Sequence, residues 1–422
     1  METAYRRTKQ LAEETDDERH FRKQADFPKI ESKMKGIGTR RHASVIDTIG
    51  SYLGAKNPFT HPANPKSHNV WLFDNTAWQS ASGEWQMHVV AAYFVKNSGK
   101  DESRSVADIS ALLGLAENAE ARDTLRRRLQ PLMDTVLPAH TITLSVTDST
   151  HRLGPSDRDG ISTNLIQIAG DYTDGSTLKS TAVDFGSSAT PLCTTFAKST
   201  GWAVISDIDD TIKKTLTVSP LGILRTTFVD EPEPIAGMPE LYAHMQIALE
   251  SPPFWYLSAS PYNLYPFLRS FRDEYYPPGT MILREASWMN LSGFLTSLSQ
   301  GTQAYKVSRM REIQSRFPGR RFVCLGDSTQ SDPEAYGEMY RAFPGWVAAI
   351  YIRRVAGVAE IDESQKNSPG RFEKAFKDIP ATVWHVFDDP AEVKAKIDEL
   401  VAESPEITAE TEEGPAVKAS AE

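Results

Sequence analysis

Six short apolar runs recur between residues 200 and 390, and stretches with helical spacing separate them. Each run is apolar along its whole length, which is typical of a strand buried on both faces. Such strands, alternating with helices, favour a parallel sheet covered by helices on both sides. We therefore predict an α/β domain over 199–400. The runs are WAVIS (202–206), FWYLS (254–258), TMILR (280–284), FVCLG (322–326), WVAAIYI (346–352) and TVWHVF (382–387).

The pattern of residue types is different between residues 69 and 198. Runs rich in β-branched and aromatic residues are separated by turn signals such as SASG, SDRDG and YTDG, which is typical of strands joined by tight loops. Residues 103–134 carry apolar residues at helical spacing and predict a helical insertion. We predict a β-sandwich-like domain over 69–198. Its candidate strands are NVWLFDN, EWQMHVVAAYFVK, HTITLSVT, STNLIQIAG and LKSTAVDFG.

The two ends of the chain are polar. Residues 1–68 form a partly helical segment that ends in a proline-rich linker. Residues 401–422 are acidic and lack aromatics, so we predict that this tail is disordered. The net charge is −10, and the stretch from Asp388 to the end, with eleven acids and three lysines, supplies −8 of it. The remainder is therefore nearly neutral, and the basic clusters in it are too short to predict nucleic-acid binding.

Neither a membrane span nor a secretory signal is predicted. The longest apolar runs, at 89–95 and 346–352, are far shorter than a bilayer-spanning helix. The first twenty residues mix both charges and have no apolar core. Cys193 and Cys324 lie in apolar segments without metal-ligand spacing, which favours reduced core cysteines of a cytoplasmic protein.

Three carboxylates crowd the end of the first apolar run, at Asp207, Asp209 and Asp210. Like charges that close repel one another. Either this strand ends on the surface and the carboxylates are solvated, or a cation belongs among them. A calcium loop fits poorly, because Thr211 and Ile212 stand where a further oxygen ligand and a glycine are required.

Other strand ends carry chemically useful side chains too. Ser258 ends the second run, Asp327 and Asp332 follow FVCLG, and Lys306 lies one helix before that run. Because ligands of parallel sheets bind at the carboxyl ends of strands, we expect these groups to converge. In this order they resemble the haloacid-dehalogenase-like phosphohydrolases, which have a Rossmann-like catalytic domain.

That resemblance implies a role for each group. Asp207 attacks phosphorus, and Asp209 protonates the leaving oxygen and then activates water. Mg²⁺ is held by Asp207, the backbone carbonyl of Asp209 and Asp327, with Asp332 anchoring metal-bound water. Ser258 and Lys306 bind the phosphoryl oxygens.

Alternatives to these roles exist within the same segments. Ser260 competes with Ser258 for the phosphate, and Lys213 and Lys214 compete with Lys306. Asp332 precedes a proline and could only initiate a turn. For Asp210 we expect a structural role, capping the first turn of the following helix.

The sequence around these site residues is similar to that of one family within the superfamily, the fungal actin-patch-type, Mg²⁺-dependent phosphatidate phosphatases. The resemblance covers roughly 69–390. It implies hydrolysis of phosphatidate to diacylglycerol, a peripheral location at membranes, and association with cortical actin and endocytic proteins. The segments that carry it are SDIDDTIKKT, TTFVDEPEPIAGMPELY, FWYLSASPYNLYPFL, FPGRRFVCLGDSTQSDPEAYG, AAIYIRRV and, before the catalytic region, VWLFDNTAW (70–78).

Chain length leaves little room for a cap over the site. Only 46 residues separate Thr211 from Ser258, and 47 separate Ser258 from Lys306. We therefore expect a site without a large cap domain, which a substrate embedded in a membrane can enter. The apolar segment 216–228 is either a flap that touches the bilayer through Leu221 and Arg225, or a packed β-hairpin.

Two other functions remain open. The same chemistry could act on a phosphoprotein or a soluble phosphate ester, which rates on vesicles and on a soluble ester would separate. Alternatively, the chain could be an endocytic scaffold that works mainly by binding proteins. The intact pair Asp207 and Asp209 argues against scaffolding alone.

Overall fold

The computed structural model describes residues 14–34, 60–98, 102–115, 117–284, 291–357 and 363–404. Most of the predicted acidic tail, and much of the predicted N-terminal segment and linker, lie outside these residues. The predicted disorder of the tail therefore stays a prediction.

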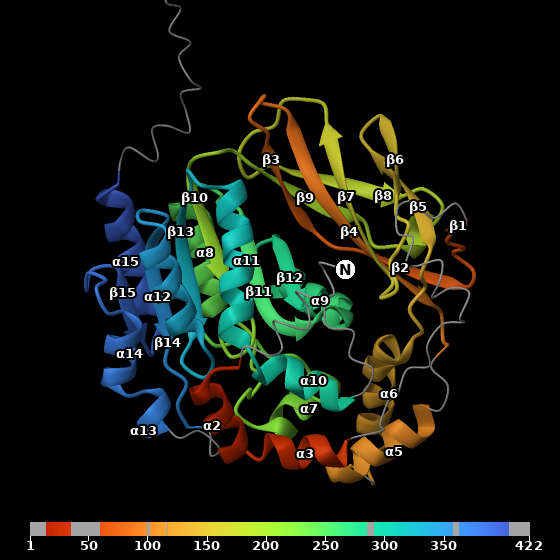
Figure 1. The fold of residues 1–422 in the computed structure, drawn as a ribbon, viewed down its shortest axis with the longest axis horizontal. Helices are drawn as coiled ribbons and strands as arrows, with labels where there is room; N and C mark the ends of the chain where they lie inside the picture. The colour runs from red at the N-terminus through yellow and green to blue at the C-terminus, as the bar shows by residue number, and fades with distance from the viewer. Residues whose placement is uncertain are drawn as a thin grey trace, which may run out of the picture.

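A six-stranded parallel sheet forms the centre of the second half of the chain, as the apolar runs predicted (Figure 1). Its order is β12-β11-β10-β13-β14-β15, so the chain starts in the middle and builds outward in both directions. All six predicted strands are present. Their bounds are β10 (Trp202–Ser206), β11 (Phe254–Pro261), β12 (Thr280–Arg284), β13 (Arg321–Asp327), β14 (Val347–Arg353) and β15 (Trp384–Phe387).

Helices cover both faces of this sheet, which is why its strands are apolar throughout. One face packs against α8 (Met238–Ala248), α9 (Tyr265–Tyr275) and α15 (Pro390–Ala402). The other packs against α11 (Thr302–Arg316), α12 (Asp332–Ala342) and α14 (Pro369–Ala375). Alternate residues of one strand serve the two faces: Val204 points to the first core, and Ala203 and Ile205 point to the second.

Further helices gather at the edge of the sheet where the strands end (Figure 1). Helix α10 packs on β11 and against α3, and α3 packs against α2. These helices share the apolar core of the α8 face. Their bounds are α2 (Asp16–Gln24), α3 (Phe27–Lys33), α7 (Pro220–Phe228) and α10 (Leu291–Ser299), and the short α13 (Glu363–Lys366) follows β14.

The first nine strands form one hydrogen-bonded, mostly antiparallel sheet with its own apolar core. Its order is β1-β5-β8-β9-β3-β4-β2, with β6 beside β5 and β7 beside β4. The prediction of a β-rich region is confirmed, and the sheet curls in Figure 1. The bounds are β1 (His61–Pro62), β2 (His68–Leu72), β3 (Asn75–Gln79), β4 (Trp85–Val95), β5 (His140–Val146), β6 (Ser149–Leu153), β7 (Ile161–Ile168), β8 (Thr177–Ala182) and β9 (Leu192–Ala197).

The predicted helical insertion is present as two helices, α5 (Glu102–Leu112) and α6 (Ala119–Met133). Their apolar residues join the core of the parallel-sheet region rather than that of the curled sheet. Together with α3 they pack around the lower end of the molecule in Figure 1.

Buried ion pairs join the two sheets. Asp74, between β2 and β3, lies 2.7 Å from the guanidinium of Arg272 and 3.0 Å from that of Arg269, both on α9. Its carboxylate also accepts the backbone N–H of Cys193 at 2.8 Å. Asp74 and Arg272 are almost fully buried, so each charge depends on the other.

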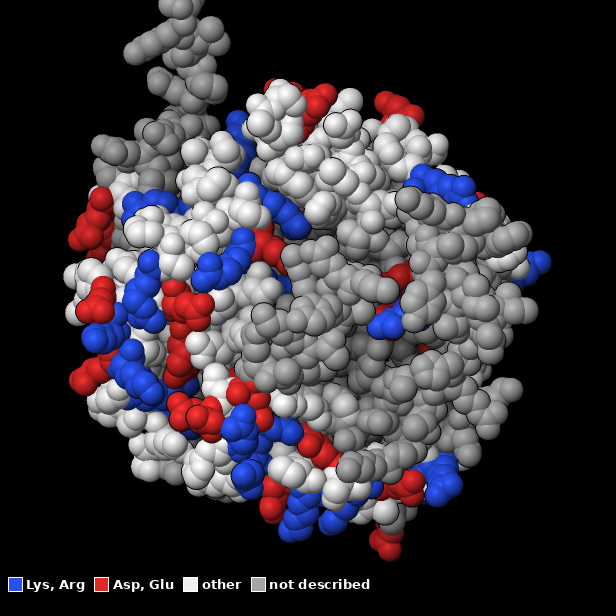
Figure 2. Space-filling view, in the orientation of Figure 1, with Lys and Arg blue, Asp and Glu red and all other residues white. Residues whose placement is uncertain are grey.

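The surface is mixed in charge on the face shown in Figure 2, where Lys and Arg alternate with Asp and Glu over α12, α14 and α15. Among the described residues, no helix combines the length and the apolarity that crossing a bilayer requires.

Candidate active site

The loop after β10 places the first carboxylates. Asp207 follows the strand directly, and Asp210 takes a left-handed backbone conformation with φ of 59°. The Asp210 carboxylate accepts the backbone N–H groups of Thr215, Leu216 and Thr217 at 2.9, 2.8 and 2.7 Å. Asp210 therefore shapes this loop. The predicted helix cap is wrong, because the next helix begins only at Pro220.

Asp207, Asp327 and Asp332 form a buried cluster in which carboxylate oxygens lie within 4.8 Å of one another. Lys306 reaches the cluster from α11. Its Nζ donates to Asp207 Oδ1 at 2.7 Å and also pairs with Asp332 Oδ1. Gly326 makes room for this arrangement, because a Cβ there would lie 2.5 Å from that of Asp332. The sequence prediction that these groups converge at one sheet edge agrees with the geometry.

Burial dominates the electrostatics of the cluster. It raises the pKa of Asp207 well above the usual range, Lys306 opposes this rise, and the neighbouring carboxylates add to it. Burial likewise raises the pKa of Asp327 to about 7, with Asp332 as the next cause. Burial alone would lower the pKa of Lys306, but Asp207 and Asp332 outweigh it and raise that pKa.

Asp209 lies on the β11 side of the cluster. One of its oxygens accepts the hydroxyl of Ser258 at 2.5 Å and that of Ser260 at 3.1 Å. The other accepts the hydroxyl of Thr215 at 2.9 Å. Both rival serines thus lie at the site and converge on one carboxylate, with Ser258 closer. The Ser258 hydroxyl also accepts the backbone N–H of Ser260 at 2.9 Å, which holds both in place.

Neither rival lysine hydrogen-bonds to the clustered acids, although the Lys213 charge lies near Asp209 and Asp210. Lys213 is buried and donates to the carbonyl of Lys214 and the hydroxyl of Thr215, at 3.1 and 3.2 Å. Lys214 pairs with Glu233 at 3.0 Å on the surface. Lys306 is the candidate that hydrogen-bonds to Asp207, in agreement with the choice made from sequence.

Several hydroxyls at the site were missed by the sequence analysis. Thr211 donates to Asp207 Oδ2 at 3.2 Å. Thr329 donates its backbone N–H to Asp327 Oδ1 at 2.6 Å, and its hydroxyl bonds to the same oxygen. The Thr217 hydroxyl lies 2.9 Å from that of Thr329 and links the two loops. Thr211 and Thr329 come within four residues of a predicted acid, and that proximity was the available signal.

The donor set fits a hard divalent cation. Three carboxylates against one ammonium leave the cluster with a charge of −2 when all are ionised (−3 + 1). Carboxylate oxygens are the ligands that Mg²⁺ prefers, and it keeps several of its waters. Asp332 already uses one oxygen for Lys306 and the other for the backbone N–H of Asp327, at 3.1 Å. Asp332 is therefore suited to an outer position.

The carboxylate cluster is less accessible to solvent than the sequence analysis predicted. The stretches between the strand ends contain only α7 and α8, then α9, β12 and α10, among the described residues. None is a separate cap. Nevertheless the side chains of Asp207, Lys306 and Asp327 are at most 1% exposed. The site is therefore closed from solvent, which the sequence did not indicate.

The apolar segment 216–228 contains a helix, α7, so the β-hairpin alternative is wrong. Ser219 caps it by accepting the N–H of Gly222 at 3.2 Å. Leu221 is 37% exposed, and Arg225 pairs with Asp230 at 3.3 Å on the surface. The two residues of the predicted flap thus lie on an outward side of α7.

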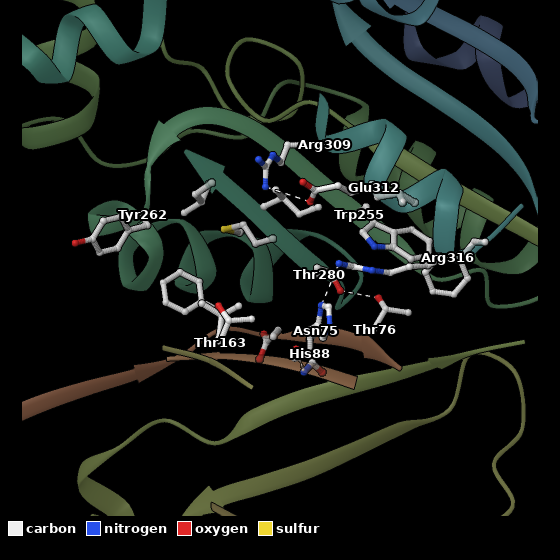
Figure 3. A pocket seen from close by; sticks show the side chains of 18 of the residues that line it. Asn75, Thr76, His88, Thr163, Trp255, Tyr262, Thr280, Arg309, Glu312 and Arg316 are labelled. Carbon is white, nitrogen blue, oxygen red and sulfur yellow. Dashed lines mark hydrogen bonds and ion pairs between the residues drawn. The ribbon is translucent and has the colours of Figure 1, made fainter. Parts of the chain in front are cut away.

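A second cavity, of about 200 Å³, lies between the two sheets and away from the carboxylates (Figure 3). Arg309 and Arg316 of α11 face it from one side, and Asn75 and His88 from the other. Arg316 hydrogen-bonds to His88 at 3.0 Å. The cavity contains none of the clustered acids, so it is not the candidate active site.

Residues 202–354 match the family model described as "Phosphatidate phosphatase APP1, catalytic domain". The chain is 26% identical over 318 residues to phosphatidate phosphatase APP1 of Saccharomyces cerevisiae, covering 70% of this chain and 53% of that protein. It is also 28% identical over 177 residues to an uncharacterised protein of Schizosaccharomyces pombe, covering 40% and 28%. The chain thus spans about half, or less, of the length of these relatives.

The matched range begins at the first residue of β10 and ends just after β14. It contains the clustered acids, both serines and Lys306, so the similarity and the geometry identify the same region. Over residues 202–354 this chain is therefore similar to the catalytic domains of the phosphatidate phosphatase APP1 family.

Proposed function

We propose that this chain is a Mg²⁺-dependent phosphatidate phosphatase that releases diacylglycerol and phosphate. One observation carries the proposal: within the matched catalytic range, Lys306 lies 2.7 Å from Asp207 in a cluster of buried acids at the ends of parallel strands. This arrangement supplies a nucleophile, a metal site and a cation for the phosphoryl group.

In the first step, an Asp207 oxygen attacks phosphorus and the bond from phosphorus to the glycerol oxygen breaks. Asp209 gives its proton to that oxygen, so diacylglycerol leaves as a neutral alcohol. Ser258 and Ser260 hold Asp209 at 2.5 and 3.1 Å, which fixes the direction of its proton. An aspartyl-phosphate remains on Asp207.

In the second step, water attacks phosphorus and gives a proton to the Asp209 carboxylate. The bond from phosphorus to Asp207 breaks, so phosphate leaves and both aspartates return to their starting states. Lys306 stabilises the charge on the phosphoryl oxygens, and the Ser258 hydroxyl, which has one proton to donate, assists it by turning from Asp209 to the phosphoryl group.

The residues that would hold Mg²⁺ are Asp207, Asp209 through its backbone carbonyl, and Asp327, with Asp332 holding a metal-bound water. The ion would neutralise the anionic phosphoryl group and allow an anionic nucleophile to approach it.

Several wider proposals accompany this chemistry. The catalytic domain, 199–400, is of the haloacid-dehalogenase type, and 69–198 is a separate β-sandwich-like domain. The enzyme is cytoplasmic, is peripheral at membranes and associates with cortical actin and endocytic proteins. The parallel sheet and the catalytic-domain match support the first of these; the others rest on the resemblance of the sequence.

The test is phosphate release from phosphatidate in mixed micelles, with and without Mg²⁺. We expect metal-dependent release that Asp207→Asn and Asp209→Asn each reduce on the order of a thousandfold or more. Release from a soluble ester but none from phosphatidate would retain the chemistry and exclude the lipid. No release from either substrate would favour the scaffold.

A further inference from the structure

The closed site cannot take a lipid headgroup in this conformation. Asp207, Asp209, Asp327 and Lys306 are each at most 3% exposed. Attack on phosphorus requires the headgroup to reach Asp207, so part of the covering structure must move first. The helices at the carboxyl edge of the sheet are the elements in position to do so (Figure 1).

Helix α2 is fastened to this edge by Glu18, which is 8% exposed. Its carboxylate accepts the backbone N–H of Thr15 within its own helix cap, and three more at this edge, from Gly301, Thr302 and Gln303, at 3.2, 2.9 and 3.3 Å. It also accepts the hydroxyls of Thr302 and Ser331, at 2.8 and 3.1 Å. Glu18 therefore occupies the N-terminus of α11, where unpaired N–H groups and the helix dipole favour an anion.

These contacts lie close to the chemistry. Thr302 begins the helix that presents Lys306 one turn later, and Ser331 immediately precedes Asp332. Because the Thr302 and Ser331 hydroxyls are also 2.9 Å apart, Glu18 ties the starts of two site-bearing helices together.

A second set of polar contacts joins α2 and α3 to α10. Arg22 forms paired hydrogen bonds to Glu31, both at 3.0 Å, and also bonds to the Ser299 hydroxyl. Glu31 in turn accepts the hydroxyl of Thr296 at 3.2 Å. The second half of α10 is thus hydrogen-bonded to the N-terminal helices, and α10 also packs against α3.

The surface of α3 that faces α10 is apolar, and we call it the underside. Phe27, Ile30 and Met34, in and just after α3, belong to the same buried cluster as Phe294, Leu295 and Leu298 of α10. Separation of α3 from α10 would expose these side chains to water, which is unfavourable, whereas exposure to acyl chains is not.

We propose that α2 and α3 form a lid that closes against α10 at the active-site edge of the sheet, latched by Glu18 and Arg22, and that a lipid surface opens it by receiving its apolar underside. The proposal rests on the proposed function and specifies how that site is regulated. A bilayer is the occupant that the chemistry favours, since the substrate of the site would itself reside there. In water the latches keep the lid closed, and at a membrane the exposed apolar face binds the surface that carries the substrate.

The first experiment locks the lid. Glu31→Cys and Thr296→Cys place thiols where two side chains now hydrogen-bond, and a short thiol-specific cross-linker that reduction can cleave then joins them. The rate on a soluble phosphate ester with Mg²⁺ is measured with and without phosphatidylcholine vesicles. We expect vesicles to raise the rate of the uncross-linked protein about tenfold, to have no effect on the cross-linked protein, and to act again after reduction.

Each single-cysteine variant, treated with the same reagent, is the control for modification of the native Cys193 and Cys324. A cross-linked protein that vesicles still activate like the parent would overturn the proposal. So would a parent that vesicles do not activate at all.

The second experiment loosens the latch and does not depend on activity. Glu18→Gln removes the charge from the N-terminus of α11, and Asp17→Asn removes an equal charge from an exposed position of the same helix. We expect backbone hydrogen exchange in α2 and α3 to be about tenfold faster in Glu18→Gln and unchanged in Asp17→Asn, with α8 and α15 unaffected in both.

The two experiments separate the lid from the proposed function. If phosphatidate is not hydrolysed but cross-linking abolishes vesicle activation on the soluble ester, the lid stands and the lipid substrate fails. If no substrate is hydrolysed, the exchange result alone decides: equal exchange in α2 and α3 of both variants would contradict the lid.

Discussion

Lys306 brings its charge to a place where Asp207 and Asp332 are both buried. In the metal-free protein, we expect Lys306→Ala to lower the free energy of unfolding by about 3–5 kcal/mol, because two buried carboxylates lose their counter-ion. Phosphate release should be lost as well. Denaturant unfolding monitored by tryptophan fluorescence measures the first effect.

Lys214→Ala is the matched control for that variant. Its ammonium is 47% exposed and pairs with an exposed carboxylate, so its removal should cost less than about 1 kcal/mol. Equal stability of the two variants would show that the Lys306 charge is not needed in the cluster.

The raised pKa values of Asp207 and Asp327 predict a pH-dependent response to Mg²⁺. A carboxyl whose pKa is raised on folding keeps its proton longer in the folded state, so the metal-free protein loses stability as pH rises through about 7. Protons compete with the metal below that pH. We expect Mg²⁺ to raise the melting temperature more at pH 8 than at pH 6.

Differential scanning calorimetry with and without Mg²⁺ measures this response. Asp327→Asn should flatten the pH dependence of the Mg²⁺ effect. A larger effect at pH 6 than at pH 8 would contradict the assignment of these acids as metal ligands.

The positions of site residues could be predicted from the sequence where those residues lie at or near the end of a strand. Asp207 directly follows β10, Asp327 ends β13, and Ser258 lies in the second half of β11, so the fold alone brings them toward one edge. Which hydroxyl meets which carboxylate depends on side-chain rotamers, and sequence does not give these. Hence the hydrogen bonds of Thr211 and Thr329 were missed.

Among the elements, α7 shows where pattern reading failed. The segment 216–228 is apolar and rich in Thr and Val, which favours a strand. Ser219 and Pro220, however, are a helix cap and a first-turn proline, and they fix the start of a helix. Continuous apolar strands were predicted well because burial on both faces leaves no competing pattern. The strands β1, β3, β6 and β9, which are short and carry polar residues, were missed apart from Asn75.

The outward side of α7 yields a prediction for membrane binding. If Leu221 and Arg225 touch the bilayer, Leu221→Asp together with Arg225→Glu should weaken binding to anionic vesicles about tenfold or more. The rate on a soluble ester should be unchanged, since both side chains lie on the surface. Vesicle co-sedimentation measures the binding.

Ile247→Asp is the control for general loss of surface apolarity, because that side chain is 80% exposed on α8. If the α7 variant co-sediments with vesicles like the parent, the prediction of a membrane flap at α7 is wrong. The lid proposal does not depend on this result.

At the scale of the whole molecule, Asp74 joins the two sheets. Its replacement by Ala leaves the buried Arg272 with only the half-exposed Asp273 as a counter-ion and frees the N–H of Cys193. We expect Asp74→Ala to lower the free energy of unfolding by about 3–5 kcal/mol. Asp184→Ala, an exposed change in the same curled sheet, should be close to neutral.

Calorimetry of Asp74→Ala tests whether the sheets unfold together. We expect one transition in the parent and two separate transitions in the variant. A single transition of Asp74→Ala at the melting temperature of the parent would show that the ion pair does not couple the unfolding of the two regions. The sequence analysis had included Asp74 in the segment VWLFDNTAW, but its partners, 195 and 198 residues further on, could not be inferred without the fold.

The bond from Glu18 to the start of α11 spans 284 residues of sequence, which matters during synthesis. At about 5–20 residues per second, a ribosome needs roughly 15–60 s to produce Thr302 after Glu18. Throughout that interval Phe27 and Ile30 have no α10 to cover them, so the nascent chain offers an apolar segment to chaperones. Asp332 emerges later still. The carboxylate cluster and the contacts of Glu18 can therefore form only after Asp332 has been made.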